Sequence, residues 1–478
     1  MKRYIAVDLG ASSGRVVVGN LHEFTVTNRF VTRNDRVNGS VYWDILYIFS
    51  EIKEGLKKAF SLFPGEGEIS GISIDTWGVD YGLLDAHGAL MGLPYHYRDA
   101  RTDGMMEEVF AKISREEIYK ETGIQFMQLN TIYQLAAMKK YQPELLGVAK
   151  TYLSVPDLLN FWLCGVAKNE FSHVSTTQLY NPETKDWSWK IIDALDLPRD
   201  IFCEIIPSGT VLGPLRPEVA AKIGAPSSVQ VIAGGSHDTA AAVAAVPVVD
   251  DKPNIYISSG TWSLLGIESD EPIITEKSLA YNFTNEGAAS GKVRFMKNIM
   301  GMWIQQECLR WWEAAGETIT FKDLDAETLA CADFPSTIDP NDNRFLKPNS
   351  SKDPMPKRVE DYCRENNLPV PVKKGEFMAV IYRGLAEAYA RYARQLSDIT
   401  GVNYEHLYVI GGGCKNFILN QWTADASGIR VSAGPVEATA LGNILIQALA
   451  LNDIPDKQAG RKLIRKYHEY TIFEPTSP

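Results

Sequence analysis

Short apolar runs alternate with longer segments of helical hydrophobic spacing along this 478-residue chain. The apolar runs predict β-strands at 4–7, 15–19, 69–74, 229–233, 254–257 and 406–410. The helical spacing predicts helices at 46–60, 130–141, 377–396 and 416–426. Alternating strands and helices in a long chain indicate α/β domains, each with a central sheet.

Two Gly/Ser-rich segments of similar pattern lie about half a chain length apart. Only residues 8–14 separate the first two predicted strands, which favours a hairpin between them. Residues 258–263 follow the strand at 254–257 in the same way. In the alignment of the two segments Gly10 matches Gly260, and Ser13 matches Ser263. The pattern favours a duplicated domain with a cleft between the copies, and a chance match of six residues is the alternative.

The chain is too long for one ordinary core, so two domains are expected. Prolines and acidic residues at 247–253 follow an alanine-rich helical segment and indicate a boundary there. We therefore expect an N-terminal domain at 1–246 that binds sugar and phosphate, and a C-terminal domain at 247–478 that binds nucleotide.

Composition excludes several classes of protein. A formal net charge of -11 argues against a nucleic-acid partner and against an anionic membrane surface. The six cysteines have no metal-binding or redox spacing, which indicates free thiols in a reducing compartment. Since neither an apolar leader nor an apolar run of membrane-spanning length is apparent, we expect a cytoplasmic protein.

The familiar nucleotide-binding signatures are missing, but the tip of the first hairpin suits a phosphate group. No GxxxxGK[ST] motif occurs, and no GxGxxG motif follows a strand. In the tip, backbone N–H groups next to glycine, the hydroxyls of Ser12 and Ser13, and the Arg15 guanidinium are all donors for an anion. Asp8, at the end of the strand, is placed to hold Mg²⁺ through water. An ordinary tight turn is the alternative.

A strand followed by two glycines and a helix of small residues places Asp238 at the start of that helix. In phosphoryl transfer an aspartate at such a site accepts the proton of the attacking hydroxyl. The alternative is that Asp238 only caps the helix. His237 is either a binding residue or a packed turn residue.

The strand at 406–410 ends in three consecutive glycines, 411–413, before a helix. A simple turn rarely needs more than one glycine, so the run favours close approach of the adenosine end of ATP. Thr261 and Gln306 are candidate polar contacts to the nucleotide. Further on, Ala438, Ala440 and Gly442 indicate close helix packing without a functional role.

The segment at 72–82 combines the acids Asp75 and Asp80 with Trp77 and two glycines beside a strand end. Carboxylates and an aromatic face are typical of polyol-binding sites. The alternative is a hairpin whose acids face solvent.

Taken in this order, these motifs resemble the FGGY carbohydrate kinases of the actin-like ATPase superfamily, from residue 4 to about 450. The likeness is strongest to members that phosphorylate L-rhamnulose, and is carried by segments 7–15, 74–80, 97–102, 258–264, 297–301 and 434–438. It implies two ribonuclease-H-like (actin-like ATPase) domains with a catalytic cleft between them. One departure is Ala11, where the wider superfamily usually has threonine; this agrees with the L-rhamnulose kinases.

The resemblance implies Mg²⁺-dependent transfer of the γ-phosphoryl group of ATP to the 1-hydroxyl of L-rhamnulose, in L-rhamnose degradation. Asp238 is then the proton acceptor. The implied sugar-binding residues are Gly78, His237, Asp238, Thr239 and Asn298, to which we add Asp80. The implied ATP-binding residues are Ala11, Ser12, Ser13, Gly14, Arg15, Thr261, Gln306 and Gly412.

Three alternatives remain open at this stage: a sister kinase for L-fuculose, xylulose or another ketose, an actin-like chaperone or filament ATPase, and a catalytically inactive sugar sensor. ADP release stimulated by a sugar discriminates among them. We expect a monomer or a small homo-oligomer.

Overall fold

The computed structural model describes residues 2–248 and 252–476, which form two compact units. Among these residues, the first unit comprises 2–248, Glu268–Met296 and Ala438–His468, and the second comprises 252–267, Lys297–Glu437 and 469–476. A single cut at 246/247 does not reproduce these units, because each unit takes up segments from both halves of the chain. Residues 249–251 of the expected boundary lie outside the described residues, and the functional division at 246/247 stays a prediction.

The first unit is built on a six-stranded sheet in the order β13-β14-β6-β1-β2-β3. The strands are β1 (Arg3–Leu9), β2 (Ser13–Gly19), β3 (Phe24–Val31), β6 (Ile69–Thr76), β13 (Thr210–Pro214) and β14 (Gln230–Ala233). β1 runs parallel to β6, which runs parallel to β14, whereas β1, β2 and β3 are joined as antiparallel neighbours. The strands that carry the sequence motifs therefore end side by side at one edge of the sheet.

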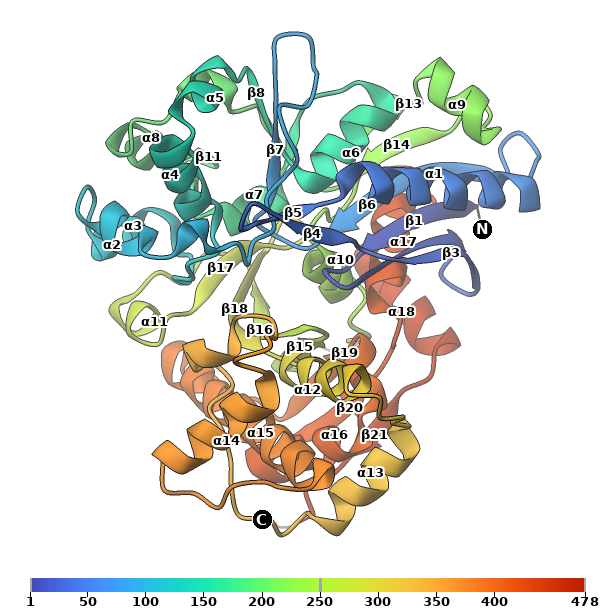
Figure 1. Ribbon diagram of the computed structural model, residues 1–478. Helices are drawn as coiled ribbons and strands as arrows, with labels where there is room; N and C mark the ends of the chain where they lie inside the picture. Colours follow the sequence, from blue (N-terminus) through green and yellow to red (C-terminus); the bar gives the residue numbers. More distant parts are fainter. Residues whose placement is uncertain (1, 249–251, 477–478) are drawn as a thin grey trace. The chain divides into compact units, whose positions relative to one another are not determined.

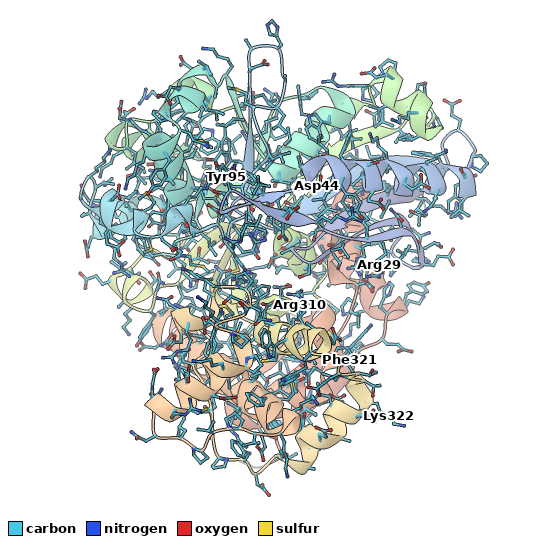
Figure 2. The ribbon with its side chains drawn as sticks, in the orientation of Figure 1. Arg29, Asp44, Tyr95, Arg310, Phe321 and Lys322 are labelled. Atoms are coloured by element: carbon cyan, nitrogen blue, oxygen red, sulfur yellow. The ribbon has the colours of Figure 1, made fainter. Side chains whose placement is uncertain are left out.

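Helices cover both faces of this sheet (Figure 1). On one face, Gly55 of α1 (Ile45–Leu62) lies so close to Val16 of β2 that an added Cβ would be 2.5 Å from its Cγ2. On the other face, Gln447 of α17 (Ala438–Ala450) donates to the Ile5 carbonyl of β1 at 2.9 Å. Asp44, which is labelled in Figure 2, caps the start of α1. Its side chain accepts from the Tyr47 N–H at 3.2 Å.

The rest of the first unit consists of short strand pairs and helices. The pairs are β4 (Asn34–Val37) with β5 (Ser40–Trp43), β7 (Tyr81–Leu84) with β8 (Thr151–Ser154), β9 (Asn169–Glu170) with β12 (Ile205–Ile206), β10 (Tyr180–Asn181) with β11 (Asp186–Trp187), and β17 (Thr284–Gly287) with the first half of β18 (Val293–Met300). The helices are α2 (Met105–Phe110), α3 (Arg115–Thr122), α4 (Thr131–Tyr141), α5 (Pro143–Val148), α6 (Val155–Cys164), α7 (Phe171–Val174), α8 (Trp189–Ala194), α9 (Pro217–Ile223), α10 (Asp238–Ala244), α11 (Glu276–Ala280) and α18 (Lys457–Tyr467).

The second unit repeats the central topology of the first. β15 (Asn254–Ser259) forms an antiparallel hairpin with β16 (Trp262–Ser269) and runs parallel to β19 (His406–Ile410), which runs parallel to β20 (Arg430–Ala433). β21 (Thr471–Phe473) adds to β20 in the antiparallel sense. The helices of this unit are α12 (Trp303–Ala314), α13 (Phe321–Ala330), α14 (Met355–Glu365), α15 (Lys374–Thr400) and α16 (Phe417–Ser427). The matching order of three parallel strands and one hairpin confirms the predicted duplication.

The sequence alignment of the two hairpins is wrong by one residue. In the first hairpin Leu9 is the register partner of Gly14, whereas in the second Ser259 pairs with Ser263. The second loop is thus one residue shorter, and Ser263 is the counterpart of Gly14 rather than of Ser13. An alignment of letters could not detect this, since a serine lies three positions after the glycine in both segments.

Candidate active site

The predicted phosphate loop is the turn between β1 and β2. Its backbone is closed by the Gly10 N–H, which donates to the Ser13 carbonyl at 3.0 Å. Gly14 is required for packing, because a Cβ there would lie 2.7 Å from the side chains of Leu9 and Phe30. Ser13 is exposed and Ser12 half-buried. The tip therefore presents hydroxyl groups, but whether they bind phosphate stays a prediction.

Asp8 and Arg15, predicted to contact the metal and the nucleotide, contact each other. The Arg15 guanidinium donates to Asp8 Oδ2 from Nε at 2.9 Å and from Nη2 at 2.6 Å. The Arg15 side chain is 17% exposed and the Asp8 side chain 9%. A partly buried pair of this kind keeps both charges in place at the strand end until a charged ligand competes for them.

Three carboxylates gather near this strand end. Asp75 of β6 is the register partner of Asp8 on the adjacent parallel strand. It is fully buried, and its Oδ2 accepts from Asn443 Nδ2 at 2.6 Å. Burial and then the Asp8 charge raise the pKa of Asp75 well above its usual range, with the Asp238 charge acting in the same direction. The site thus concentrates negative charge that a cation would relieve.

The oxygen donors around Asp8 fit a divalent cation. Asp75 Oδ1 is buried without a hydrogen-bond partner among the described residues, and a carboxylate oxygen is the ligand type that hard cations prefer. Within 2–248 and 252–476, no group of three or more His, Cys, Asp or Glu side chains is arranged as a direct metal cage. Mg²⁺ does not need such a cage, since it keeps several waters and shares nucleotide oxygens. The contact through Asp8 stays a prediction.

Asp238 is the first residue of α10, and its side chain does not cap the helix. The N-cap is His237, which makes no side-chain capping bond. The capping explanation for Asp238 is therefore wrong. The Asp238 side chain is 29% exposed, and its Oδ1 accepts from Thr239 Oγ1 at 3.1 Å. Burial raises the pKa of Asp238, and the Asp8 charge adds to this shift, whereas hydrogen bonds from Thr239 oppose it.

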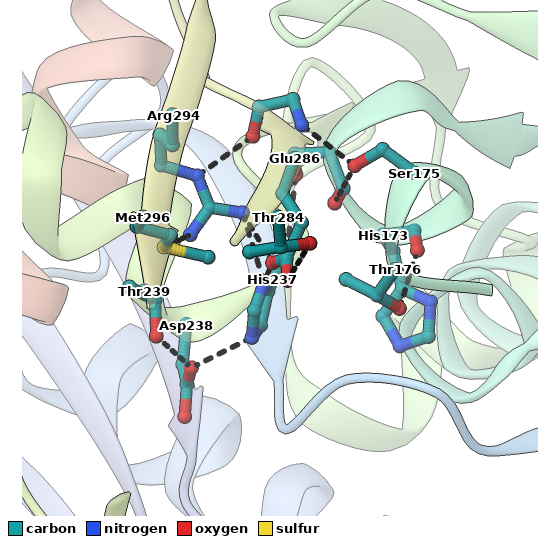
Figure 3. A network of polar contacts seen from close by, with 12 residues as sticks. His173, Ser175, Thr176, His237, Asp238, Thr239, Thr284, Glu286, Arg294 and Met296 are labelled. Carbon is teal, nitrogen blue, oxygen red and sulfur yellow. Dashed lines mark hydrogen bonds and ion pairs between the residues drawn. The ribbon is translucent and has the colours of Figure 1, made fainter. Parts of the chain in front are cut away.

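Gly78 and His237 border the same space. A Cβ on Gly78 would lie 3.4 Å from His237 Nε2 and 3.4 Å from Thr176 Oγ1. His237 Nε2 in turn lies 3.5 Å from Asp238 Oδ1. Figure 3 draws the contact between these two side chains. Three of the predicted sugar-binding residues thus lie together, joined by Thr176, which the sequence did not single out.

The turn that carries Asp238 is fixed to α7 by a buried acid. Glu170 accepts from the Ser172 N–H at 2.9 Å, from Ser172 Oγ at 2.6 Å and from the Ser236 N–H at 3.1 Å. Ser172 Oγ then accepts from the His237 N–H at 3.2 Å. These bonds tie the Gly-Gly-Ser-His-Asp turn to the segment that bears Thr176.

Asp80 lies away from solvent in an aromatic cluster. Its Oδ2 accepts from Trp43 Nε1 at 2.6 Å, from Trp77 Nε1 at 3.0 Å and from the Tyr97 N–H at 3.1 Å. Gln134 Nε2 donates to the other oxygen at 2.9 Å. Both Asp75 and Asp80 are fully buried, so the alternative of a hairpin with solvent-facing acids is wrong. The contact between Asp80 and sugar stays untested, but protein donors already use both of its oxygens.

The backbone between Gly78 and Asp80 is strained. Val79 has φ of +69°, a conformation that a β-branched residue rarely adopts. Its N–H donates to Thr176 Oγ1 at 3.1 Å, and its carbonyl accepts from Thr131 Oγ1 at 2.6 Å. Strain of this kind persists only where the surroundings enforce it, so the bonds to Thr131 and Thr176 hold the loop that carries Gly78.

We expect the stability of the protein to depend on pH through Asp80. Burial raises the pKa of Asp80 to about 7, against the opposing bonds from Trp43, Gln134 and Trp77. Because the unfolded value is near 4, the folded state binds the extra proton between about pH 4 and pH 7. The stability that this proton adds is fully present below pH 4 and is lost as pH rises through 7. Between pH 5.5 and 8 the free energy of unfolding should therefore fall by about 2 kcal/mol.

Urea unfolding of the wild type and of Asp80→Asn at a series of pH values tests this expectation. Between pH 5.5 and 8, the free energy of unfolding of the variant should fall by about 2 kcal/mol less than that of the wild type. Identical pH slopes would contradict the assignment. Asp35→Asn, at an exposed carboxyl on β4, is the matched control and should keep the wild-type slope.

In the second unit, the three consecutive glycines have different structural reasons. Gly411 has φ of +85°. Gly413 lies against the end of β15, since a Cβ there would be 2.0 Å from Ser259 Oγ. Gly412 has open space around it and no positive φ, so packing does not require a glycine. This is the glycine predicted to lie against the nucleotide, and that role stays a prediction.

The other predicted residues of this unit are partly exposed. Thr261 is in the loop between β15 and β16, and its carbonyl accepts from the Trp303 N–H at 3.1 Å. Gln306 lies on α12, with its Oε1 buried and without a hydrogen-bond partner among the described residues. Asn298 lies on β18, in the part that belongs to the second unit. Their contacts with a ligand stay predictions.

Comparison with known proteins shows the class to which the protein belongs. Residues 3–244 match the N-terminal domain, and residues 255–451 the C-terminal domain, of the FGGY family of carbohydrate kinases. The chain belongs to this family and is a phosphotransferase that acts on a carbohydrate. Membership implies ATP, a sugar substrate and a divalent metal ion.

Among curated relatives, the chain is 44% identical to a rhamnulokinase of Halalkalibacterium halodurans over 97% of both chains. It is 42% identical to a rhamnulokinase of Oceanobacillus iheyensis, covering 98% of this chain and 97% of the relative. It is 40% identical to a rhamnulokinase of Bacteroides thetaiotaomicron, covering 99% of this chain and 96% of the relative.

Solved structures share the fold at low sequence identity. A xylulose kinase from Lactobacillus acidophilus has a TM-score of 0.80 at 16% identity, covering 100% of this chain and 94% of that one. A glycerol kinase from Plasmodium falciparum has a TM-score of 0.77 at 14% identity with the same coverage. The predicted actin-like α/β fold is thereby confirmed. No helix within 2–248 and 252–476 has the length and apolar character of a membrane span.

Proposed function

We propose that the protein is a rhamnulokinase, which transfers the γ-phosphoryl group of ATP to the 1-hydroxyl of L-rhamnulose in L-rhamnose degradation. The observation that carries the proposal is the identity of 40–44% to three rhamnulokinases over nearly the whole chain. Solved structures of xylulose and glycerol kinases resemble the protein at 14–18% identity and support the fold alone.

In this proposal Asp238 accepts the proton of the attacking hydroxyl. Its carboxylate is partly exposed at the start of α10, and His237 and Gly78 lie beside it. A base of modest strength suffices, because proton transfer to a positioned group contributes mainly late in phosphoryl transfer. Gly78, His237, Thr239 and Asn298 bind the sugar, and Asp80 supports the loop that carries Gly78.

The nucleotide is assigned to residues of both predicted domains, 1–246 and 247–478. These residues are Ala11, Ser12, Ser13, Gly14, Arg15, Thr261, Gln306 and Gly412. Mg²⁺, when bound, neutralises charge on the β- and γ-phosphates, and Asp8 holds it through water. We also propose a cytoplasmic location, since all six cysteines are free thiols, and a monomer or small homo-oligomer as the working state.

ADP release with Mg²⁺-ATP and a panel of L-rhamnulose, L-fuculose, D-xylulose and glycerol tests the proposal. We expect kcat/KM for L-rhamnulose to exceed that for each other compound at least about tenfold. Identification of the product as the 1-phosphate by phosphorus NMR would complete the assignment.

Two outcomes of this assay would change the proposal. Preference for a sister ketose would overturn the substrate and keep the reaction class. No stimulation by any sugar, with ATP still bound, would favour a sugar sensor. Asp238→Asn serves as the catalytic blank, and the reaction without sugar gives the background of ATP hydrolysis.

A further inference from the structure

A buried arginine contacts His237 on the side opposite Asp238 (Figure 3). Arg294, on β18, is fully buried, and its Nη2 lies 3.0 Å from His237 Nδ1. The same nitrogen donates to Glu286 Oε2 at 3.2 Å, and Nε donates to the Gly287 carbonyl at 2.8 Å. The guanidinium is therefore held by partners on β17 independently of the histidine.

We propose that Arg294 is a positioning residue that holds His237 as the neutral tautomer with its proton on Nε2. A guanidinium donates hydrogen bonds and accepts none, so His237 Nδ1 must be the acceptor of this bond. In a neutral imidazole the other nitrogen then carries the proton. Arg294 thus determines which atom of His237 faces the site as a donor.

The competing arrangement would place a proton on Nδ1 and donate it to Glu286. Glu286 Oε2 lies 3.4 Å from His237 Nδ1, beyond the usual range of an N–H···O bond and farther than Arg294. Glu286 already accepts from Arg294, and its other oxygen accepts from Thr284 Oγ1 at 3.3 Å. The carboxylate nearest to Nδ1 is thus already paired with Arg294, at 3.2 Å.

The Nε2 side of His237 faces the predicted sugar-binding residues. Asp238 Oδ1 lies 3.5 Å from Nε2, and Gly78 and Thr176 border the same space. The nearest other imidazole, that of His173, is neutral at working pH, because burial lowers its pKa to about 3. An Nε2–H donor fixed in this way orients the Asp238 carboxylate or a substrate oxygen, and it does so without a net charge.

The tautomer is directly measurable by nitrogen NMR of protein labelled with ¹⁵N-histidine. The chain has seven histidines, and the His237 signals are identified by their loss in His237→Gln. At neutral pH we expect a long-range proton–nitrogen spectrum in which Nδ1 has the shift of an unprotonated nitrogen and Nε2 that of a protonated one. A proton on Nδ1, or protons on both nitrogens, would overturn the proposal; this readout needs no substitution of Arg294 and no substrate.

Substitution of Arg294 tests the cause. Arg294→Met removes the donor, and we expect the Nδ1 signal to move towards that of a mixed or reversed tautomer. Arg294→Lys keeps a cationic donor and should retain part of the wild-type pattern. Unchanged His237 signals in folded Arg294→Met would overturn the role of the arginine. Arg358→Met is the matched control, since Arg358 is also a buried arginine with carbonyl and carboxylate partners, but in the second unit.

The kinetic consequence rests on the proposed function. We expect Arg294→Met to raise KM for the activating sugar about tenfold or more while KM for ATP changes little, as for the loss of one positioned hydrogen bond. Arg294→Lys should recover part of this loss. Equal increases in both KM values would indicate general structural damage and contradict the positioning role. If no sugar is active, the NMR result still decides the tautomer.

Discussion

Asp238→Asn is expected to lower kcat for sugar phosphorylation at least about a hundredfold, within the usual range for a positioned general base. The substitution preserves the size of the side chain and its contact with Thr239 Oγ1, which lies 3.1 Å from Oδ1. It removes the negative charge and, with it, the capacity to accept a proton. Because Asp238 does not cap α10, the helix should form as before. The affinity for ATP, measured by calorimetry, should stay within about twofold.

The measurement is steady-state ADP release with saturating sugar, together with the melting temperature of the variant. A folded Asp238→Asn protein with unchanged kcat would remove Asp238 from the role of base. Asp35→Asn, an exposed carboxyl with the same change of charge, should retain full activity. This control separates the loss of a base from the loss of one negative charge.

Gly442→Ala is expected to destabilise the first unit by about 3 kcal/mol or more. α17 packs against α10 so closely that a Cβ at Gly442 would lie 1.7 Å from the Ala241 carbonyl oxygen. The obstacle is backbone, which cannot move aside as a flexible side chain could. To make room, the two helices must move apart, and α10 begins at Asp238. Activity should therefore fall even under conditions in which the variant remains folded.

Urea unfolding and ADP release, measured on the same preparations, check both effects. Gly147→Ala is the matched control, because Gly147 is an exposed residue of helix α5 with open space around it. Alanine there should be neutral or stabilise the protein by up to about 1 kcal/mol. If the two variants had equal stability, the close contact between α10 and α17 would be disproved.

Local pattern predicted the elements that carry the site. The strands that became β1, β2, β6, β14, β15 and β19 are buried on both faces or nearly so, and such strands read as plain apolar runs. Gly442, with small neighbours on its helix, likewise indicated the close packing that the structure confirms. Hairpins and helix ends depend on residues that are close in sequence, so they could be predicted from the sequence.

The residues that position the site could not be predicted, because their partners are far away in the chain. Asn443 reaches Asp75 across 368 positions, and Arg294 reaches His237 across 57. Neither residue belongs to a motif, and a single asparagine or arginine is usually at the surface. One weak signal was available: Arg294 stands between apolar residues in a strand-like run, at a position where a charge must be paired.

The first unit is built from three separate segments of the chain, and this affects how the protein folds during its synthesis on the ribosome. The sheet of this unit is laid down from residues 3–9 onward, but the helix that covers one of its faces begins only at Ala438. Until that helix emerges, the Ile5 carbonyl and the Asp75 carboxyl lack the donors that Gln447 and Asn443 later supply. Domains usually fold one after another as the chain is synthesised. Here the earliest strands must wait for almost the last helix, and in that interval an apolar sheet face is open to chaperones and to other nascent chains.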